Sequence, residues 1–397
     1  MRLVFNGSRF SPAYRLLLLR PQPFPVRPNL RSPPSNQRPR CAASLPPFLR
    51  EMAHRDDTGS GPDAAPTGSK NSYLIVITGK SSSDNEFAFS LKHKKSLKLA
   101  EGEEEIQILV HSELQNPCGL QTFQTNLYMN NLSTCVFGRF LMWSPRLPST
   151  HDLVSQNFCE LPLGTVCITD IQFKGRGRSK NVWESPHGCL LFSFTLEMDN
   201  GHILPLLQYV VSLAIVEAIR VACEAKGLPC LDVKIKWPND LYLDGLKVGG
   251  VLCTSAYRSK KFNVSAGIGL NLNNDMPTTC LNTALQKLTS GSLRLTREEI
   301  LASFFSRFES LYEAFINQGF QALESLYYKY WMHSGQKVVI EEKHGNPSPE
   351  NSVVAIQGLT SSGYLLAIDD DNKKYELHPD GNSFDFFKGL IKKKMES

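Results

Sequence analysis

Two arginines alternate with glycines in one short segment of the chain, GRGR at positions 175–178. Glycines let a backbone pass close to a ligand, and arginines offer paired N–H donors to a carboxylate or a phosphate. Trp183, five residues further on, offers a flat aromatic face for a purine ring. Together these residues suit an acyl-adenylate, which is a carboxylate joined to AMP. A basic surface loop is the alternative explanation.

A second polar cluster follows a short predicted strand. The stretch KIKWPND occupies positions 234–240, and KVGG at 247–250 places another lysine beside glycines. Asp240 lies just past a strand end, where open α/β sheets bind their ligands. A third stretch, GIGLNLN at 267–273, has glycines inside a strand pattern, which marks the close approach of a ligand or another backbone. Each cluster alone also fits a strand core or a turn.

The order and spacing of these clusters resemble the biotin protein ligases, also called holocarboxylase synthetases. The transit-like composition of residues 1–51, with no winged-helix pattern ahead of the ligase core, makes the chain resemble the plant type. The matching segments are GRGR with W-x-S-P-x-G-C-L, then KWPNDLY, KVGGVL and GIGLNLN. The resemblance implies an α+β fold, with a mixed-sheet α/β ligase core and a small C-terminal SH3-like β-barrel domain. It also implies a ligase that makes biotinyl-5′-AMP from biotin and ATP. Such a ligase then transfers biotin to a specific lysine in the carrier domain of a biotin-dependent carboxylase.

The resemblance assigns roles to individual residues. The implied biotin-binding positions are Ser149, Thr150, His151, Gln172, Gly175, Arg176, Gly177, Arg178, Lys247 and Gly250. The implied ATP-binding positions are Arg178, Trp183, Lys236, Asn239, Asp240 and Asn271. The expected catalytic set consists of Arg178, Lys236, Asp240 and Lys247.

Two positions depart from the pattern of the bacterial relatives. His151 stands where those members have asparagine, and Thr254 stands where they have glutamate. The side-chain role of His151 is therefore open, and no role is assigned to Thr254. Ser149 and Thr150 also fit a helix N-cap, and both explanations can hold together.

The implied chemistry follows from charge. The biotin carboxylate attacks the α-phosphate of ATP, so two anions must approach each other. Cationic side chains, and Mg²⁺ on the phosphates, offset that repulsion. The acceptor lysine must lose a proton before it attacks the mixed anhydride, and Asp240 is a candidate helper. We expect the loop arginines to need a ligand anion to hold them, because residues 175–182 contain no acidic side chain.

Hydrophobic patterns predict the elements that must position these residues. Strands are expected over 166–173, 190–198, 233–237, 247–254 and 262–272, and helices over 204–226 and 296–319. Thr296 and Glu299 form a capping-box pattern at the start of the second helix. Short alternating runs beyond residue 335 predict the small β-barrel.

Composition divides the chain into segments. Residues 1–50 hold nine of the 43 Lys and Arg residues and no Asp or Glu, which is typical of an organelle transit peptide. The expected segments are a transit peptide in 1–51, a disordered linker in 52–70, an accessory α/β region in 71–134, the catalytic domain in 135–333 and the barrel domain in 334–392. The prolines favour the plastid, with the mitochondrion as an alternative, and translation from Met52 would give a cytosolic form.

Charge and cysteine spacing limit the partners. Beyond residue 50 the chain carries 34 basic and 38 acidic residues, so no basic surface for nucleic acid is expected. No run approaches the length of a membrane span. The ten cysteines form no C-x-x-C pair, which argues against a structural zinc site. The expected partners are the biotin carboxyl carrier domains of acetyl-CoA carboxylase and related carboxylases.

Three other functions are alternatives to this prediction. A lipoate ligase or octanoyl transferase would share the fold, but the paired GRGR and KWPND motifs favour biotin. A DNA-binding repressor would need a winged helix and a basic surface, neither of which the sequence predicts. A non-catalytic accessory protein would not need the arginine, lysine and aspartate positions that are present.

Overall fold

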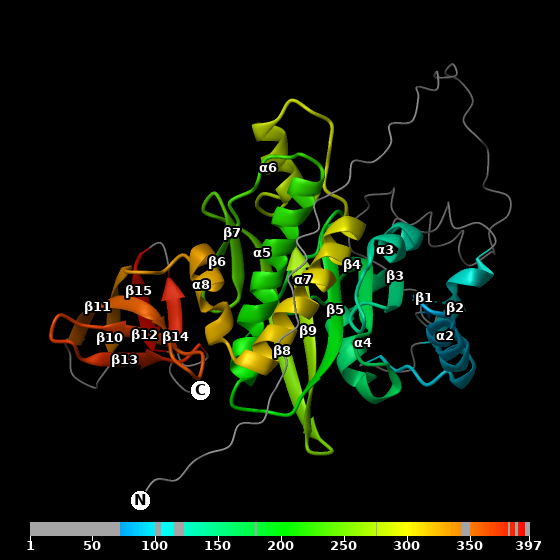
Figure 1. Cartoon of the computed structure of the whole chain (residues 1–397), viewed down its shortest axis with the longest axis horizontal. Helices are drawn as coiled ribbons and strands as arrows, with labels where there is room; N and C mark the ends of the chain where they lie inside the picture. Colours follow the sequence, from blue (N-terminus) through cyan, green and yellow to red (C-terminus); the bar gives the residue numbers. More distant parts are fainter. Residues whose placement is uncertain are drawn as a thin grey trace, which may run out of the picture. The chain divides into compact units, whose positions relative to one another are not determined.

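A nine-stranded mixed β-sheet positions the predicted site residues (Figure 1). The computed structural model describes residues 72–99, 105–114, 123–178, 181–274, 276–342, 350–379, 382–385 and 388–393. The predicted transit peptide and linker, residues 1–51 and 52–70, lie outside the described residues. In sheet order the strands are β2 (Glu105–Val110), β1 (Ser72–Gly79), β3 (Phe140–Leu147), β4 (Val166–Gln172), β5 (Leu190–Met198), β9 (Lys261–Leu270), β8 (Leu246–Arg258), β7 (Asp240–Leu243) and β6 (Lys234–Lys236).

The predicted core strands are confirmed, with shifts at their ends. Strand β5 coincides with the predicted run 190–198, and β4, β8 and β9 overlap theirs. Strands β8 and β9 form a long antiparallel hairpin in which Gly250 is paired with Gly269. Strand β6 is shorter than predicted, because Pro238 has no N–H to continue the ladder and the chain turns there into β7.

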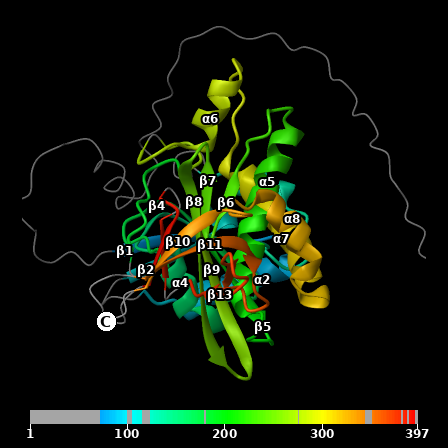
Figure 2. The same ribbon diagram turned by 90° about the vertical axis from the view of Figure 1, so that its left-hand side faces the viewer.

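The helices include both predicted ones, α5 and α7. Glu299 N donates to Thr296 Oγ1 and Thr296 N donates to Glu299 Oε2, so the predicted capping box of α7 is confirmed. Figure 2 shows α5, α7 and α8 together on one side of β8 and β9. The helices are α2 (Ser82–Lys94), α3 (Thr125–Asn131), α4 (Thr150–Gln156), α5 (Leu207–Ala225), α6 (Leu281–Leu288), α7 (Arg297–Gln318) and α8 (Gln321–Tyr330), with short 3₁₀ turns η1 (His111–Glu113), η3 (Phe158–Glu160) and η5 (Leu204–Leu206).

One helical segment is as apolar as a membrane span. Leu204–Ala225, which contains α5, has the length and hydropathy to cross a membrane, but 83% of its most apolar window is buried inside the protein. A core helix that packs on all sides has the same composition. The apolar surface of α5 is therefore used in packing, and no other segment of the described residues has comparable length and hydropathy.

The two faces of β5 serve different purposes. Phe192 and Phe194 point to one face, where both rings pack edge-on against Phe304 of α7. Side chains alternate along a strand, so Ser193 points to the opposite face. There its Oγ lies 2.8 Å from Oγ1 of Thr150 on α4. The aromatic face anchors the sheet on α7 and leaves the other face to polar side chains.

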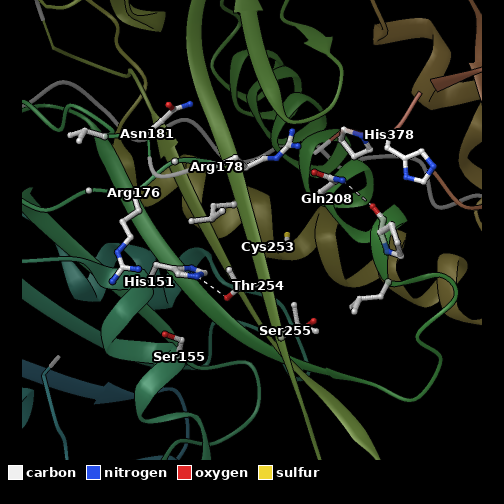
Figure 3. A pocket seen from close by; sticks show the side chains of 18 of the residues that line it. His151, Ser155, Arg176, Arg178, Asn181, Gln208, Cys253, Thr254, Ser255 and His378 are labelled. Carbon is white, nitrogen blue, oxygen red and sulfur yellow. Dashed lines mark hydrogen bonds between the residues drawn. The ribbon is translucent and has the colours of Figure 1, made fainter. Parts of the chain in front are cut away.

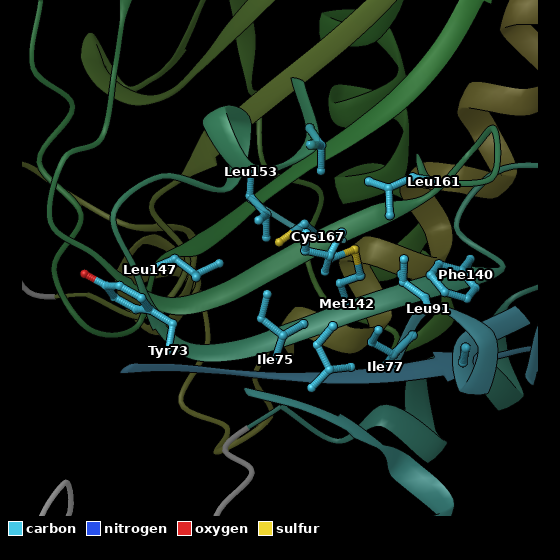
Figure 4. Close-up of a cluster of buried hydrophobic side chains, with 14 of the residues drawn as sticks. Tyr73, Ile75, Ile77, Leu91, Phe140, Met142, Leu147, Leu153, Leu161 and Cys167 are labelled. Carbon is cyan, nitrogen blue, oxygen red and sulfur yellow. The ribbon is translucent and has the colours of Figure 1, made fainter. Parts of the chain in front are cut away.

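The strands of the predicted accessory region extend the same sheet. Strand β1 pairs antiparallel with β3 and parallel with β2. Tyr73, Ile75 and Ile77 of β1 share one hydrophobic cluster with Leu91 of α2 and Leu153 of α4 (Figure 4). Lys80, which follows β1, donates through Nζ to the carbonyl oxygens of Met129 and Leu132 at the end of α3. Lys80 thus has a structural role. The boundary of the accessory region stays a prediction.

The short strands predicted beyond residue 335 are confirmed and form a separate sheet. Its order is β13-β12-β11-β10-β15-β14. Among the described residues no ladder joins β13 to β14, so closure into a barrel stays a prediction. The strands are β10 (Lys337–Glu342), β11 (Glu350–Leu359), β12 (Leu365–Ile368), β13 (Lys374–Leu377), β14 (Asn382–Asp385) and β15 (Leu390–Lys393).

Candidate active site

One cavity of about 440 Å³ collects most of the predicted site residues. The first turn of α4, the loop after β4, the β6–β7 turn and the facing strands β8 and β9 surround it. Three separate sequence clusters therefore meet in one place. The predicted residues that line the cavity are Ser149, Thr150, His151, Gln172, Arg176, Gly177, Arg178, Trp183, Lys236, Asn239, Asp240, Lys247 and Gly250.

The first turn of α4 supplies neutral hydrogen-bonding groups to one end of the cavity. Ser149 caps the helix, because its Oγ accepts from Asp152 N at 3.2 Å. Thr150 N and Oγ1 donate to Gln172 Oε1 at 2.9 and 3.3 Å. Thr150 Oγ1 also contacts Ser193 Oγ at 2.8 Å. Ser149 therefore both caps the helix and lines the cavity, whereas Thr150 joins α4 to β4 and β5.

The two positions that depart from the bacterial pattern contact each other. His151 Nε2 lies 2.9 Å from Thr254 Oγ1 on β8 (Figure 3). Burial lowers the pKa of His151 to about 4, with Arg176 acting in the same direction and Asp152 against it. The imidazole is therefore neutral near pH 7. Its buried Nδ1 has no hydrogen-bond partner among the described residues, and a Cβ placed on Gly267 would lie 3.0 Å from it.

Backbone hydrogen bonds shape the glycine–arginine loop into a narrow turn. Gly177 N donates to Asn181 O at 2.8 Å, and Trp183 N donates to Gly175 O at 3.0 Å. A Cβ on Gly175 would lie 2.5 Å from Trp183 O, so only glycine fits at this position. The described part of the loop is therefore a turn whose conformation is fixed by its own backbone hydrogen bonds.

A protein carboxylate holds one of the two loop arginines. Arg176 Nη2 lies 2.9 Å from Asp152 Oδ2, and the Asp152 side chain is only 14% exposed. The expectation that the loop arginines need a ligand anion is therefore wrong for Arg176. The partner comes from α4 rather than from the loop, and no local pattern in the sequence links positions 152 and 176.

Trp183 packs against two glycines that are paired across β8 and β9. A Cβ would lie 2.4 Å from Trp183 Nε1 if it were placed on Gly269, and 3.4 Å from Cζ3 if it were placed on Gly250. Lys247 Nζ lies over the indole at 5.3 Å from the ring centroid. The predicted close approach at the strand glycines is confirmed, and the group that approaches is an indole ring.

Charged groups meet at the other end of the cavity. Asp240 Oδ1 lies 2.6 Å from Lys247 Nζ, and Asp240 Oδ2 lies 3.8 Å from Lys236 Nζ. Arg178 Nη1 donates to Asn239 Oδ1 at 3.3 Å, which ties the loop to the β6–β7 turn. Two lysines thus flank one carboxylate, and Arg178 is held at the neighbouring residue of the same turn, an arrangement suited to an added anion such as a polyphosphate.

Two predicted site residues do not line the cavity. Gly175 lies in the turn that supports it. Asn271 is buried, and its Nδ2 donates to Thr278 Oγ1 and Thr279 O at 3.2 and 3.1 Å. The ATP-binding role of Asn271 stays a prediction. Sequence reasoning also missed Ser193, which lines the cavity from the middle of β5. A serine within the apolar run 190–198 was the signal that could have found it.

A larger groove of about 1570 Å³ opens beside the cavity (Figure 3). His151 and Arg176 line both spaces, so the two adjoin. Residues 375–379, in and after β13, form part of the groove lining. Val182 and Phe173, which are 80% and 40% exposed, add apolar surface on the loop side. A space of this size exceeds that of most small-molecule pockets and can admit part of another protein.

Comparison with known proteins agrees with this geometry. The sequence model of the Biotin/lipoate A/B protein ligase family matches residues 143–271, which contain most of the cavity lining. The chain is 60% identical to "Biotin--protein ligase 1, chloroplastic" of Arabidopsis thaliana, over 81% of this chain and 88% of that protein. It is 58% identical to "Biotin--protein ligase 2" of the same plant, over 81% of this chain and 98% of that protein.

A solved structure is also similar to the chain. It is a biotin protein ligase mutant from Aquifex aeolicus in complex with biotin, at 25% sequence identity and a TM-score of 0.47. The match covers 60% of this chain and 95% of that chain.

Proposed function

Because this chain belongs to the biotin–protein ligase family, we propose that biotin and ATP react in the 440 Å³ cavity. The enzyme makes biotinyl-5′-AMP from biotin and ATP and transfers biotin to a lysine of a biotin-dependent carboxylase. The observation that supports placing biotin and ATP in this cavity is its division into a neutral polar end and a cationic end. The lipoate or octanoyl alternative is not favoured, given 60% identity to a named biotin ligase over most of the chain.

The neutral end suits the ring system of biotin. A cyclic urea offers N–H donors and a carbonyl acceptor but no charge, so neutral polar groups can bind it without desolvating an ion. Thr150, Gln172 and Ser193 supply hydroxyl and amide groups at this end. His151 Nδ1 adds a buried polar atom that lacks a partner in the described part of the chain.

The cationic end suits the phosphates of ATP. Lys236, Lys247 and Arg178 provide the positive charge, and Trp183 provides the surface for adenine. Lys247 contacts both the Trp183 ring and Asp240. It therefore lies between the proposed adenine and phosphate positions, near the atom that must accept the biotin carboxylate.

The first step joins biotin to AMP. A carboxylate oxygen of biotin bonds to the α-phosphorus, the bond from that phosphorus to the bridging oxygen of the β-phosphate breaks, and pyrophosphate leaves. Fixed cations stabilise the negative charge that grows on the departing oxygens. Alignment of the two bound reactants can contribute roughly 7–11 kcal/mol to lowering the barrier.

The cavity lining fits a Mg²⁺ ion that is bound together with ATP. Asp240 is the one carboxylate among the described residues that line the cavity, and the described residues contain no group of three metal-binding side chains. Mg²⁺ is typically held by one or two carboxylates together with substrate phosphates and water. Asp240 and the phosphates would hold it, and the ion would neutralise phosphate charge.

The second step transfers biotin to the acceptor lysine. The amine nitrogen bonds to the acyl carbon of the mixed anhydride, AMP leaves, and the amine proton passes to a base. Asp240 is the proposed base because it is the carboxylate within the cavity. We propose that carrier domains of acetyl-CoA carboxylase and related enzymes approach through the 1570 Å³ groove, since it adjoins the cavity along the loop.

The proposed location is the plastid. Residues 1–51 carry the composition of a transit peptide, and the Arabidopsis relative at 60% identity is named chloroplastic. Import into the mitochondrion is the alternative, and translation from Met52 would give a cytosolic form. A reporter fused to residues 1–51 should enter the plastid, and a cytosolic reporter would contradict this proposal.

The decisive experiment measures both half-reactions. The purified protein should release pyrophosphate from ATP only when biotin is present, and label from biotin should pass to a purified carboxylase carrier domain. Replacement of biotin by lipoate or octanoate should abolish both signals. Pyrophosphate release that does not depend on biotin, or equal use of lipoate, would contradict the proposed function.

A further inference from the structure

The tryptophan of the KWPND motif is fixed by two buried hydrogen bonds that the reaction itself does not explain. Trp237 N donates to His333 Nε2 at 2.9 Å. Trp237 Nε1 donates to the hydroxyl of Tyr209 at 3.0 Å. All three residues are buried, with 0–1% of their surface exposed. A buried donor that loses its partner carries a large desolvation penalty, so these bonds restrict where Trp237 can lie.

Both partners of Trp237 connect to the C-terminal sheet. Tyr209, on α5, donates its hydroxyl to Gly363 O at 2.5 Å, in the turn between β11 and β12. A Cβ on Gly363 would lie 3.2 Å from the Tyr209 ring, so the turn sits directly on that ring. His333 lies in the segment between α8 and β10, where Gly335 N donates to Ile356 O of β11 at 3.0 Å and Met332 N donates to Ile235 O of β6 at 3.1 Å.

The protonation state of His333 fits the role of an acceptor. The Trp237 backbone N–H can only donate, so Nε2 must carry a lone pair. Nδ1 then carries the proton and donates to Gln336 Oε1 at 3.0 Å. Burial lowers the pKa of His333 to about 4, so the ring is neutral near pH 7.

The restrained position lies within the proposed ATP site. Trp237 directly follows Lys236 and precedes Asn239 and Asp240 by two and three residues. On its other side the turn is held by β8, because Val251 N donates to Asn239 O at 2.9 Å. Trp237 is thus the point at which contacts from the C-terminal sheet can set the position of the phosphate-binding side chains.

We propose that Tyr209 and His333 are positioning residues for ATP, which couple the C-terminal sheet to the KWPND turn through Trp237. This inference rests on the proposed roles of Lys236 and Asp240. Neither positioning residue is among the described residues that line the cavity, so their loss should weaken the use of ATP and spare the use of biotin.

The test compares KM values for ATP and for biotin in biotin-dependent pyrophosphate release. Tyr209→Phe removes one hydroxyl, and His333→Leu removes the acceptor for Trp237 N. Each should raise KM for ATP about fivefold, as expected for one buried neutral hydrogen bond, and leave KM for biotin unchanged. His333→Gln places an amide oxygen near Trp237 N and should restore much of the loss.

A matched control separates positioning from general stability. Tyr128, on α3 in the predicted accessory region, is also fully buried. Its hydroxyl donates to Gly138 O at 2.8 Å. Tyr128→Phe should lower the melting temperature by about as much as Tyr209→Phe does, and it should leave the KM values for ATP and for biotin unchanged. An unchanged KM for ATP in Tyr209→Phe and His333→Leu, or an equal rise of KM for ATP in Tyr128→Phe, would overturn the inference. Biotin-independent pyrophosphate release by the unaltered protein would instead overturn the proposed function.

Discussion

The two ends of the cavity are built by different physical means. At the proposed biotin end, Thr150, Gln172 and Ser193 are joined in a network of neutral hydrogen bonds. At the proposed ATP end, Lys236 and Lys247 flank Asp240 as ion pairs. The groups at the biotin end are already hydrogen-bonded to one another without a ligand. At the ATP end the two lysines are paired with Asp240, so an incoming anion must compete with that carboxylate for them.

This difference shows how one cavity can distinguish two ligands. Neutral side chains that are hydrogen-bonded to one another hold fixed positions, so they select a ligand by its shape at a small electrostatic cost. A carboxylate between two lysines keeps the cations near the required position without ligand, and it leaves a net positive charge for the phosphates. Substitutions at the two ends should therefore change different kinetic constants.

The largest effect is expected at the cationic end. Lys247→Met should lower the rate of biotinyl-AMP formation about 10²–10³-fold, because it removes a fixed charge near the reacting phosphate. Biotin binding, measured by calorimetry without ATP, should weaken far less than the rate, although Lys247 is also an implied biotin-binding position. Lys261→Met is the matched control, since Lys261 forms an ion pair with Glu197 at 2.9 Å outside the cavity and should leave the rate unchanged. A loss of biotin binding in Lys247→Met equal to the loss of rate would remove the distinction between the two ends.

A smaller effect is expected where the loop meets the ATP end. Arg178→Ala removes the side chain that bonds Asn239, and it leaves the adenylate without one of its cations. Loss of an arginine–anion contact of about 2 kcal/mol corresponds to roughly 30-fold faster escape of biotinyl-AMP. Filter retention of labelled adenylate measures this escape, and unchanged retention would argue that Arg178 only shapes the loop.

A change at the neutral end should act on biotin alone. Thr150→Val keeps the side-chain shape but removes the hydroxyl that bonds Gln172 and Ser193. KM for biotin should rise about fivefold, and KM for ATP should not change. Thr165→Val serves as the control. Thr165 is buried outside the cavity lining, and its Oγ1 donates to Pro162 O at a distance of 2.6 Å. A rise in KM for ATP of the same size would show that the two ends are not independent.

The last effect is on stability rather than on a kinetic constant, and it tests whether the biotin end must stay uncharged. Burial lowers the pKa of His151 from 6.5 to about 4, so between these values the unfolded chain binds a proton that the folded chain does not. Stability is therefore fully present above pH 6.5 and is lost as the pH falls toward 4, by roughly 1.4 kcal/mol for each pKa unit. The melting temperature should fall less between pH 7 and pH 5 in His151→Gln than in the unaltered protein. An equal fall would show that His151 is not held neutral.

Local patterns accounted for the core strands, for the C-terminal strands and for helices α5 and α7, and the family resemblance accounted for the members of the cavity. Strand β5 coincides with the run 190–198, because a buried strand needs a short apolar stretch and little else. The capping box at Thr296 and Glu299 is likewise a contact within one helical turn. The clusters at 175–178 and 234–240 could be assigned to one site because their residue types and order resemble a known family.

The fold class, the family and the segments that line the cavity could thus be inferred from the amino-acid sequence. Which side chains pair in and around the cavity follows from the tertiary packing. His151 and Thr254 are 103 positions apart, and Trp237 and His333 are 96 apart. No periodicity or spacing connects such residues, since their contact depends on sheet register and on how helices and the C-terminal sheet pack. The ion pair of Arg176 with Asp152 arises in the same way, because α4 places the carboxylate beside a loop that has none of its own.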